Sequence, residues 1–295
     1  MDWQPGDIPE LHGRTFVVTG ANGGLGEVTA GVLAGRGATV VMACRNVVKA
    51  QQIADRIKAG STGDVQVAAL DLTSLASVRD FAAQQGEFDV LVNNAGIMNV
   101  PMSRTADGFE SQFGVNHLGH FALTGLLLDK IGDRVVTVSS IAHKQTPKFW
   151  IDDLNYEHRF YQRNLAYAQS KLANLMFARE LQRRLTAAGS AKRSYAVHPG
   201  VSGTHLFDND KTVAGIVAKY GMGLVGQPPE RAAESMLFAA TMPDADPTAY
   251  WGPTRLMQAR GPVGRCPSNR LSRNQQLWRR LWEKSEQMTG VIYSF

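Results

Sequence analysis

The chain has 295 residues, of which 44% are hydrophobic and 19% are charged. These proportions are typical of a globular protein with enough apolar residues for a core, and they exclude disordered and fibrous proteins. The net charge of +5 is concentrated at one end, because residues 255–295 contain eight arginines or lysines and two glutamates. We interpret residues 255–295 as a solvated basic C-terminal extension, with an acidic partner or a phosphate-bearing substrate as the alternative, and we expect no nucleic acid partner.

The two cysteines, Cys44 and Cys266, lie far apart in unrelated contexts. Their spacing gives neither a disulfide framework nor a metal-ligand pattern, so we expect no metal site and a reducing, cytoplasmic compartment. The first 14 residues lack the apolar segment of a signal peptide. No stretch approaches the ~20 apolar residues of a membrane-spanning helix, so we expect no membrane anchor.

Short apolar runs alternate with longer segments of helical period along the first 200 residues. The runs are almost continuously apolar, which is typical of parallel strands that are covered on both faces. We therefore predict a single-domain α/β Rossmann fold over residues 1–295, with a doubly wound, mostly parallel sheet and helices on both faces. The predicted strands are 15–19, 38–43, 65–70, 88–92, 134–138 and 194–197.

The pattern changes after residue 200. We expect a helix over 211–222, a helix that opens near Pro229 and a last helix over about 273–288, whereas the Pro/Gly-rich segment 243–267 contains no predicted strand. Residues 204–226 lie outside the strand–helix framework, and we expect them to contact the substrate and to act as a lid.

A glycine-rich segment follows the first predicted strand directly and leads into a helix that we expect to begin near Gly24. Glycines let backbone amides approach a pyrophosphate, and a helix N-terminus favours negative charge. Since ligands bind beyond the carboxyl ends of strands in such sheets, the segment is a predicted dinucleotide site. It contributes Gly20, Asn22, Gly23, Gly24, Leu25 and Gly26.

The residue after the second predicted strand indicates which dinucleotide binds. An acidic residue there hydrogen-bonds the ribose hydroxyls of NAD and repels the 2′-phosphate of NADP. This chain has Arg45 instead, and a guanidinium suits a phosphate dianion in charge and geometry, so we expect NADP(H). Asp71 closes the third strand, where it is placed to accept a hydrogen bond from the adenine amino group or to cap the helix that starts near Ser74.

Tyr167 and Lys171 stand four residues apart within a helical pattern, so both project from one face of the helix. A free tyrosine has a pKa of about 10, but an adjacent ammonium and the positive nicotinamide ring favour the phenolate. Tyr167 is therefore a candidate acid/base that exchanges a proton with a substrate oxygen. Ser139 and Ser140 follow the strand 134–138, where a hydroxyl can hold that oxygen; a pair of capping or turn serines is the alternative.

Taken together, these motifs resemble those of the short-chain dehydrogenase/reductase family over nearly the whole chain. They are TGxxxGxG at 19–26, Asn93-Asn94-Ala95-Gly96, Asn116, the serine pair, YxxxK at 167–171, and His198-Pro199-Gly200 with Thr204.

The resemblance implies that Tyr167 is the acid/base and that Lys171 lowers its pKa while binding the nicotinamide ribose. It implies that Ser140, the second serine, orients the substrate oxygen, and that Asn116 holds a water linking Lys171 to solvent. It also implies a homodimer or homotetramer. The further residues that it assigns to the cofactor are Leu72, Asn94, Ala95, Gly96, Val197, Pro199, Gly200, Val201 and Thr204.

Finer features resemble the retinol-dehydrogenase-like branch, which generally uses NADP. They are Ala43-Cys44-Arg45-Asn46, the run 116–121, and Leu172-Ala173-Asn174 after the YxxxK motif. Gly23 stands where that branch usually has a serine able to touch the cofactor phosphate, which leaves more of the specificity to Arg45. The resemblance thus implies an NADP(H)-dependent oxidoreductase for a carbonyl or alcohol, and residue types favour an apolar, aromatic or polyketide-like substrate.

Two other functions are weighed against this one. An NADP-dependent epimerase or dehydratase shares the tyrosine and lysine chemistry, but such proteins resemble a branch with TGxxGxxG spacing and a larger sugar-nucleotide domain. A protein that binds NADP as a sensor without chemistry is the second alternative, and the complete set Tyr167, Lys171, Ser140 and Asn116 argues against it. His117 and His120, together with Trp251, Trp278 and Trp282, are interpreted as packing residues.

Overall fold

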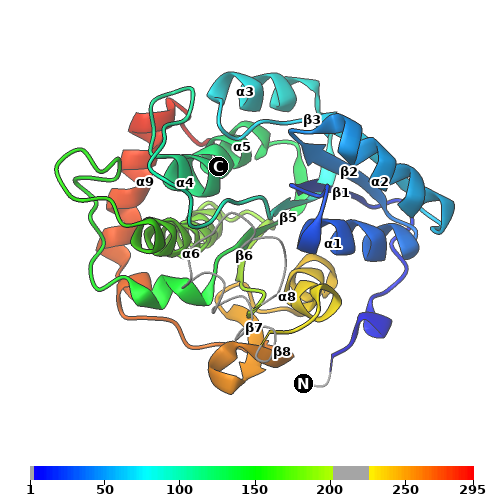
Figure 1. Cartoon of the computed structure of the whole chain (residues 1–295). Helices are drawn as coiled ribbons and strands as arrows, with labels where there is room; N and C mark the ends of the chain where they lie inside the picture. The colour runs from blue at the N-terminus through cyan, green and yellow to red at the C-terminus, as the bar shows by residue number, and fades with distance from the viewer. Residues whose placement is uncertain (1–2, 202–225) are drawn as a thin grey trace.

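The computed structural model describes residues 3–201 and 226–295, and its centre is one eight-stranded sheet (Figure 1). The strand order is β3-β2-β1-β4-β5-β6-β7-β8, and every neighbouring pair is parallel except β7 and β8. This arrangement confirms the predicted Rossmann-type α/β fold. The strands are β1 Thr15–Thr19, β2 Thr39–Cys44, β3 Asp64–Ala69, β4 Phe88–Asn93, β5 Ile131–Val138, β6 Arg193–Val197, β7 Tyr250–Arg255 and β8 Arg260–Arg265.

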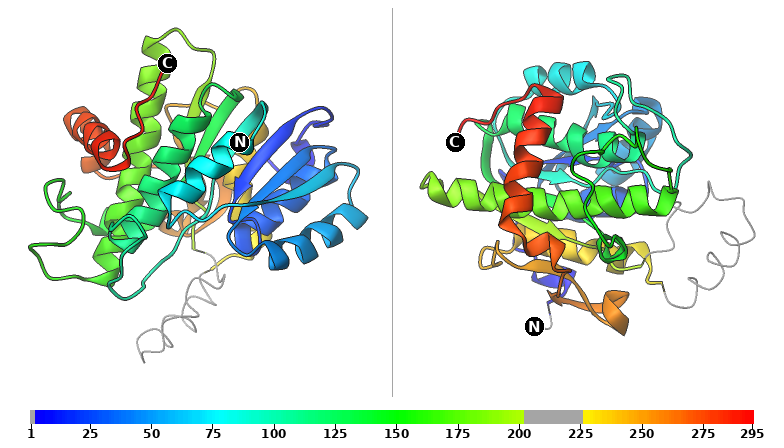
Figure 2. Two further views of the ribbon diagram at one scale, coloured as in Figure 1. Left: turned by 90° about the horizontal axis from the view of Figure 1, so that it is seen from above. Right: turned by 90° about the vertical axis from the view of Figure 1, so that its left-hand side faces the viewer.

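Helices cover both faces of the sheet (Figure 2). One face carries α1 (Gly24–Gly35), α2 (Val47–Ala59) and α8 (Pro229–Thr241). The other carries α3 (Leu75–Gln84), α5 (Gly119–Leu127), α6 (Arg163–Ala187) and α9 (Gln275–Thr289). Shorter turns are α4 (Ser111–Phe113), a π-helical turn at Gly114–Leu118, and 3-10 turns at Pro5–Asp7, Ile141–Gln145, Leu256–Gln258 and Leu271–Arg273.

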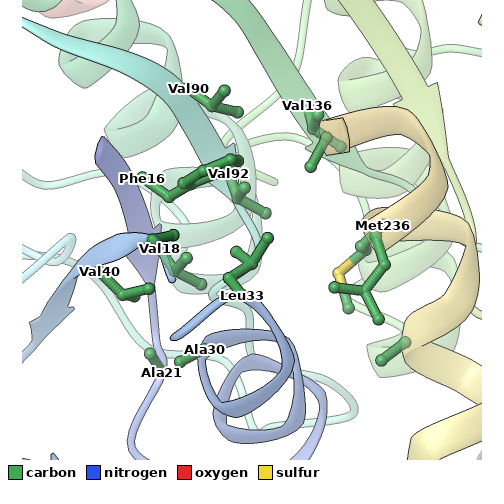
Figure 3. Close-up of a cluster of buried hydrophobic side chains, with 14 of the residues drawn as sticks. Phe16, Val18, Ala21, Ala30, Leu33, Val40, Val90, Val92, Val136 and Met236 are labelled. Atoms are coloured by element: carbon green, nitrogen blue, oxygen red, sulfur yellow. The ribbon is translucent and has the colours of Figure 1, made fainter. Parts of the chain in front are cut away.

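Alternating side chains of the strands fill the two layers. Phe16 and Val18 of β1 pack with Leu33 of α1 and Met236 of α8 in the cluster that Figure 3 shows, whereas Val17 packs on the opposite face. Both kinds of position are fully buried, which explains why these strands are continuously apolar.

The strand order reverses between β1 and β4, because β2 and β3 extend the sheet from β1 in one direction and β4 to β8 extend it in the other. Ligands of doubly wound sheets bind beyond the carboxyl ends of the strands at such a point. β4 pairs with β1 on one side and with β5 on the other, and Figure 1 labels β1 and β5 near this point.

The hairpin of β7 and β8 lies in the Pro/Gly-rich segment where no strand was predicted. Pro253 and Pro262 lie in its strands, and β8 is the edge of the sheet, where proline is tolerated. Gly252 is required by close packing, since a Cβ there would collide with the ring of His198. The prolines and glycines of this segment therefore do not indicate a loop. They are explained by the sheet edge and by the close contact between Gly252 and the His198 ring.

The predicted C-terminal extension is folded rather than a solvated tail. Its helix α9 packs on α6, and Trp282 lies against Phe121, Phe177 and Tyr293 with 1% of its surface exposed. The hydroxyl of Tyr293 donates a hydrogen bond to the carbonyl of Phe121 at 2.6 Å. The predicted packing role of Trp282 is confirmed.

Several predicted features lie outside the described residues: the helix 211–222, most of the lid 204–226, and Thr204. Within residues 3–201 and 226–295, no helix combines the length and the apolar character needed to cross a membrane.

Candidate functional site

A cleft of about 860 Å³ opens at the carboxyl ends of the strands on either side of the reversal point. Its size falls in the range of small-molecule sites. The predicted residues that line it are Gly20, Asn22, Gly23, Gly24, Leu25, Gly26, Arg45, Asp71, Leu72, Asn94, Ala95, Gly96, Ser140, Tyr167, Lys171, Pro199, Gly200 and Val201. Asn116 lies behind this lining. Val197, which was predicted to contact the nicotinamide, is buried in the apolar core and does not line the cleft. The structure brings together the other predicted site residues that it describes.

The glycine loop between β1 and α1 packs directly on the backbone that follows β4. Gly20 has φ +65°, and a Cβ there would be 2.9 Å from Ala95 Cα. A Cβ on Gly26 would be 2.6 Å from both Asn94 Nδ2 and the Gly20 carbonyl oxygen. Glycine at these two positions therefore lets the N-terminus of α1 sit at the floor of the cleft with its amides free for an anion.

Thr19 ties the two loops together. Its Oγ1 accepts hydrogen bonds from the backbone N–H groups of Asn94 and Ala95, both at 3.0 Å, and the Asn94 side chain donates to the Thr19 carbonyl at 2.8 Å. Oγ1 also lies 2.9 Å from His120 Nε2. Because His120 Nδ1 lies 3.0 Å from a carbonyl oxygen, that of Asn116, Nδ1 carries the ring hydrogen and Nε2 accepts from Thr19.

His120 is thus a neutral packing residue as predicted, and burial lowers its pKa to about 4. His117 is also buried, with a pKa lowered to about 3 by burial, and its Nε2 lies 2.9 Å from Ser285 Oγ. Both histidines support the cleft from below rather than lining it.

Two basic side chains stand at the end of the cleft formed by β2 and α2. Arg45 follows β2, and Lys49 lies in the first turn of α2, whose N-cap Asn46 accepts a hydrogen bond from Lys49 N at 2.9 Å. Lys49 Nζ would be 3.5 Å from a Cβ on Gly23, so it reaches the glycine loop. Neither Arg45 nor Lys49 forms an ion pair with the described residues.

Lys49 was missed by the sequence analysis. The signal was its spacing of four residues from Arg45, which places both at the start of one helix. Lys49 Nζ lies beside Gly23, which has no side chain of its own for the phosphate.

Asp71 lines the cleft, but its predicted alternative role as a helix cap is wrong. Ser74 is the N-cap of α3 and accepts from Ser77 N at 3.3 Å. Asp71 Oδ1 instead accepts from the backbone N–H and the hydroxyl of Thr73, at 2.9 and 2.7 Å. The short side chain closes a local turn at the end of β3.

Tyr167 and Lys171 face the cleft from α6, and Ser140 faces it from the end of β5. Burial raises the pKa of Tyr167 to about 12, and a hydrogen bond with Ser140 acts in the opposite direction. Burial lowers the pKa of Lys171 to about 8. In the protein alone, burial therefore outweighs the lowering of the tyrosine pKa that was expected from Lys171, and the phenol is protonated at neutral pH.

The two serines have different partners. Ser139 Oγ donates to the Lys171 carbonyl at 2.7 Å and is 1% exposed, so it joins β5 to α6. Ser140 Oγ accepts from Ala142 N at 3.1 Å and borders the cleft beside Tyr167. The hydroxyl of Ser140 bonds to Tyr167, another group of the cleft, whereas that of Ser139 is used within the fold.

Asn116 lies in the π-helical turn that precedes α5. Its Oδ1 accepts from Ile97 N at 2.8 Å, and its Nδ2 donates to the Ile97 carbonyl at 2.9 Å. A Cβ on Gly96 would be 3.1 Å from Asn116 Oδ1 and 3.4 Å from Lys171 Nζ. Lys171 Nζ also donates to the Val138 carbonyl at 3.1 Å. Asn116 and Lys171 therefore approach each other across Gly96. π-helical turns such as the one that holds Asn116 are frequent at functional sites.

The residues after β6 close the remaining side of the cleft. Gly200 has φ +75° and donates through its N–H to His198 Nδ1 at 3.2 Å. Val201 N donates to the Ala259 carbonyl at 2.8 Å, which anchors this segment to the turn between β7 and β8. The hairpin missed in the sequence thus fixes one wall of the predicted site.

Known proteins resemble this arrangement in sequence and in structure. A family model described as short chain dehydrogenase matches residues 14–152. Human "Retinol dehydrogenase 13" is 39% identical over 296 residues, which is 95% of this chain and 86% of that protein. The chain belongs to the short-chain dehydrogenase/reductase family. Within the family it is retinol-dehydrogenase-like, as its motifs predicted.

Solved structures share the fold. A crystal structure of an uncharacterized protein from Mycobacterium paratuberculosis is 44% identical and covers 100% of both chains with a TM-score of 0.85. A Burkholderia phymatum short chain dehydrogenase/reductase in complex with NAD has a TM-score of 0.63 over 82% of this chain and 89% of that one. At 20% identity, that likeness shows the fold alone.

Membership makes the chain an oxidoreductase of a family that uses a nicotinamide cofactor, NAD or NADP, and acts on small molecules. Tyr167 and Lys171 lie beyond the residues that the family model matches.

Proposed function

We propose that this protein is an NADP(H)-dependent oxidoreductase that transfers a hydride between the nicotinamide and a carbonyl or alcohol, with Tyr167 as the acid/base. The observation that carries the proposal is the convergence of Tyr167, Lys171 and Ser140 with the glycine loop in one cleft. A dinucleotide in this cleft would extend from the basic end of Arg45 and Lys49 to Tyr167.

The residues of the cleft fit such a cofactor. The glycines that approach Asn94 and Ala95 leave the N-terminus of α1 for a pyrophosphate. Arg45 and Lys49, which have no acidic partner among the described residues, would bind the 2′-phosphate of NADP through charge-assisted hydrogen bonds. NAD offers only hydroxyls there, so two uncompensated cations favour NADP(H).

The nicotinamide supplies or accepts the hydride when it is bound. Ser140 would donate a hydrogen bond to the substrate oxygen and hold it beside Tyr167. In the direction of reduction, Tyr167 gives its proton to that oxygen as negative charge develops on it, and its raised pKa keeps the proton in place until then. Lys171 is buried with a pKa of about 8 and stays mainly protonated at neutral pH, so its ammonium stabilises the phenolate that remains.

The test is the oxidation of NADPH, followed by absorbance, with aliphatic, aromatic and polycyclic aldehydes and ketones, and with NADH in parallel. Turnover with NADPH well above NADH is expected. Tyr167→Phe should lower kcat by about 10²- to 10⁴-fold, the range of general acid–base catalysis, while NADPH binding is kept. Tyr156→Phe is the matched control, because Tyr156 is a buried tyrosine outside the cleft.

The same experiment separates the alternatives. A sensor would bind NADPH, oxidise none of it, and be indifferent to Tyr167→Phe. An epimerase or dehydratase would convert its substrate without net oxidation of NADPH. Either result would overturn the oxidoreductase proposal.

A further inference from the structure

The far end of the cleft, beyond Tyr167 and Ser140, has a mixed lining. Met98, Val100 and Ile141 contribute apolar surface, and three amide residues, Asn99, Gln145 and Asn164, belong to the same lining. An apolar substrate alone would need no amides in this wall, and we consider Gln145 and Asn164, which follow Ser140 and precede Tyr167 in the sequence.

Asn164 shares the face of α6 that carries the reacting groups. Asn164, Tyr167 and Lys171 have the spacing i, i+3 and i+7, which aligns them on one side of a helix. A rise of about 1.5 Å per residue places Asn164 roughly 4.5 Å from Tyr167 along the axis, and Lys171 roughly 6 Å away in the opposite direction. The face therefore presents three polar groups in a row: Lys171 at the cofactor, Tyr167 at the reacting oxygen, and Asn164 beyond it.

Gln145 ends the 3-10 turn that begins after Ser140 and packs on α6. The backbone around it is fixed by its neighbours. His143 Nδ1 bonds the Ser140 carbonyl at 2.6 Å, and Lys144 Nζ donates to Gln258 Oε1 at 2.9 Å. Gln145 is held at this position by the two residues that precede it rather than by its own side chain.

Both amide side chains are uncommitted, unlike those of Gln169 and Asn174 beside the site. Gln169 Oε1 accepts from Trp150 N at 3.1 Å, and Asn174 Nδ2 donates to the Val138 carbonyl at 3.0 Å. The side chains of Gln145 and Asn164 form no hydrogen bond with the part of the chain that the structure describes. An exposed free amide is ordinarily just hydrated, but here two of them stand on fixed backbone at the end of the cleft next to Tyr167.

We propose that Gln145 and Asn164 bind a second polar group of the substrate, a hydroxyl or a carbonyl two or three carbons from the reacting carbonyl. The favoured substrates are then oxygenated ketones and aldehydes rather than carbonyl compounds whose remainder is hydrocarbon. This inference rests on the proposed oxidoreductase function. It adds a substrate class, because the catalytic groups recognise only the reacting oxygen.

A matched pair of substrates tests it: 3-hydroxy-1-phenylpropan-1-one and 1-phenylbutan-1-one, which differ by a hydroxyl in place of a methyl. One neutral hydrogen bond to the substrate raises kcat/KM by about 2- to 10-fold. With one bond from each of the two amides, the wild-type protein should favour the hydroxyketone by roughly 5- to 100-fold in kcat/KM. Gln145→Leu and Asn164→Leu should each lower kcat/KM for the hydroxyketone by about 2- to 10-fold without lowering it for 1-phenylbutan-1-one.

Gln162→Leu is the matched control. Gln162 is an exposed amide just before α6 that makes no capping hydrogen bond and lies outside the cleft lining. The preference for the hydroxyketone should survive this change. Equal turnover of both ketones by the wild-type protein, or equal losses for both in the two leucine variants, would overturn the inference while leaving the oxidoreductase proposal intact.

Thermal shift with NADPH present separates failure of the inference from failure of the proposed function. If neither ketone is reduced, the hydroxyketone should still raise Tm for the wild-type protein and not for the double variant Gln145→Leu/Asn164→Leu. Absence of both reduction and Tm shift would overturn the inference as well.

Discussion

The two ends of the cleft are built in different ways. At the cofactor end, the loop between β1 and α1 packs on the backbone after β4: Gly20 and Gly26 lie against Asn94 and Ala95, and the Thr19 hydroxyl is saturated by hydrogen bonds. At the opposite end the wall includes the free amide side chains of Gln145, on a 3-10 turn, and of Asn164, in the first turn of α6. The difference teaches that the cofactor end tolerates few changes, whereas the substrate end can change specificity without disturbing the fold.

The largest effect is expected from breaking the close packing at the cofactor end. Gly26→Ala places a Cβ 2.6 Å from Asn94 Nδ2 and from the Gly20 carbonyl oxygen, so the loop and the start of α1 must move. Since a displacement of about 1 Å can cost on the order of 10²-fold, affinity for NADPH should fall by about 100-fold or more. NADPH fluorescence titration measures the affinity, and circular dichroism checks that the variant is folded.

Gly31→Ala is the control on the same helix. A Cβ on Gly31 would meet only Ile57 Cγ1, at 3.9 Å. Alanine is more stable than glycine in a helix interior by about 0.5–1 kcal/mol, so this variant should bind NADPH normally and unfold at a slightly higher temperature. Normal binding by Gly26→Ala would show that the glycine loop does not need its tight packing.

A smaller, more selective effect is expected from the basic pair. Arg45→Ala and Lys49→Ala each remove hydrogen bonds from a charged group, worth about 1.5–3 kcal/mol, so each should raise KM for NADPH by roughly 10- to 100-fold. KM for NADH should stay the same, because NADH has no 2′-phosphate. Steady-state kinetics with both cofactors measures the change.

Lys58→Ala, near the other end of α2, is the control for a loss of positive charge on the same helix. Lys58 pairs with Asp64 at the surface and lies outside the cleft, so both KM values should be unaffected. If the KM values for NADPH and NADH rise equally in the Arg45 or Lys49 variant, that side chain contacts a part that both cofactors share and not the 2′-phosphate. The argument for a preference for NADP would then fail.

The parts of the fold that depend on local sequence were predictable, and those that depend on distant contacts were not. The strands β1, β2, β4, β5 and β6 were predicted because burial on both faces requires continuous apolar runs. The edge strand β3 has exposed positions and was predicted because its run is still largely apolar. The glycine loop was predicted because its place after a strand is a local sequence signal. The hairpin of β7 and β8 was missed because Pro253 and Gly252 indicate a loop unless the sheet edge and His198 are already in place. A sequence shows local conformation more directly than contacts between distant segments.

The site follows the same rule. Tyr167 and Lys171 form a pattern within one helix, whereas the positions of Lys49 beside Gly23 and of Asn116 beside Gly96 depend on tertiary packing. The free state of Gln145 and Asn164 was also invisible in the sequence, because it depends on which partners the fold leaves to them. The single-domain organisation, the cytoplasmic compartment and the homodimer or homotetramer stay predictions.

The smallest effect at neutral pH is expected from the buried histidines beneath the two ends. His120 supports Thr19 at the cofactor end, and His143 supports Ser140 at the other. His143 Nδ1 bonds the Ser140 carbonyl, while its Nε2 accepts from Asn269 N at 3.3 Å, so both rings are neutral with the hydrogen on Nδ1. Burial is the main cause that lowers both pKa values to about 4.

These lowered values make stability depend on pH in a definite direction. In the unfolded chain the histidines bind protons below about pH 6.5, but in the folded protein they stay neutral down to about pH 4. The free energy of unfolding should therefore decrease as pH falls from 6.5 to 4, by up to about 1.4 kcal/mol per pH unit for each buried histidine. Urea unfolding between pH 7.5 and 4.5 measures this slope.

His120→Gln and His143→Gln should each make the slope shallower, because each removes one group that takes up a proton on unfolding. His158→Gln, which changes an exposed side chain, should leave the slope as it is. Protonation of His120 at acidic pH would weaken its contact with Thr19 at the cofactor end, so the affinity for NADPH should decrease there. Protonation of His143 would weaken its contact with Ser140 at the other end, so the preference for the hydroxyketone should decrease. If the slope of the unfolding free energy against pH is unchanged in both variants, neither ring is held neutral in the folded protein. His120 and His143 would then not support the two ends of the cleft as buried neutral groups.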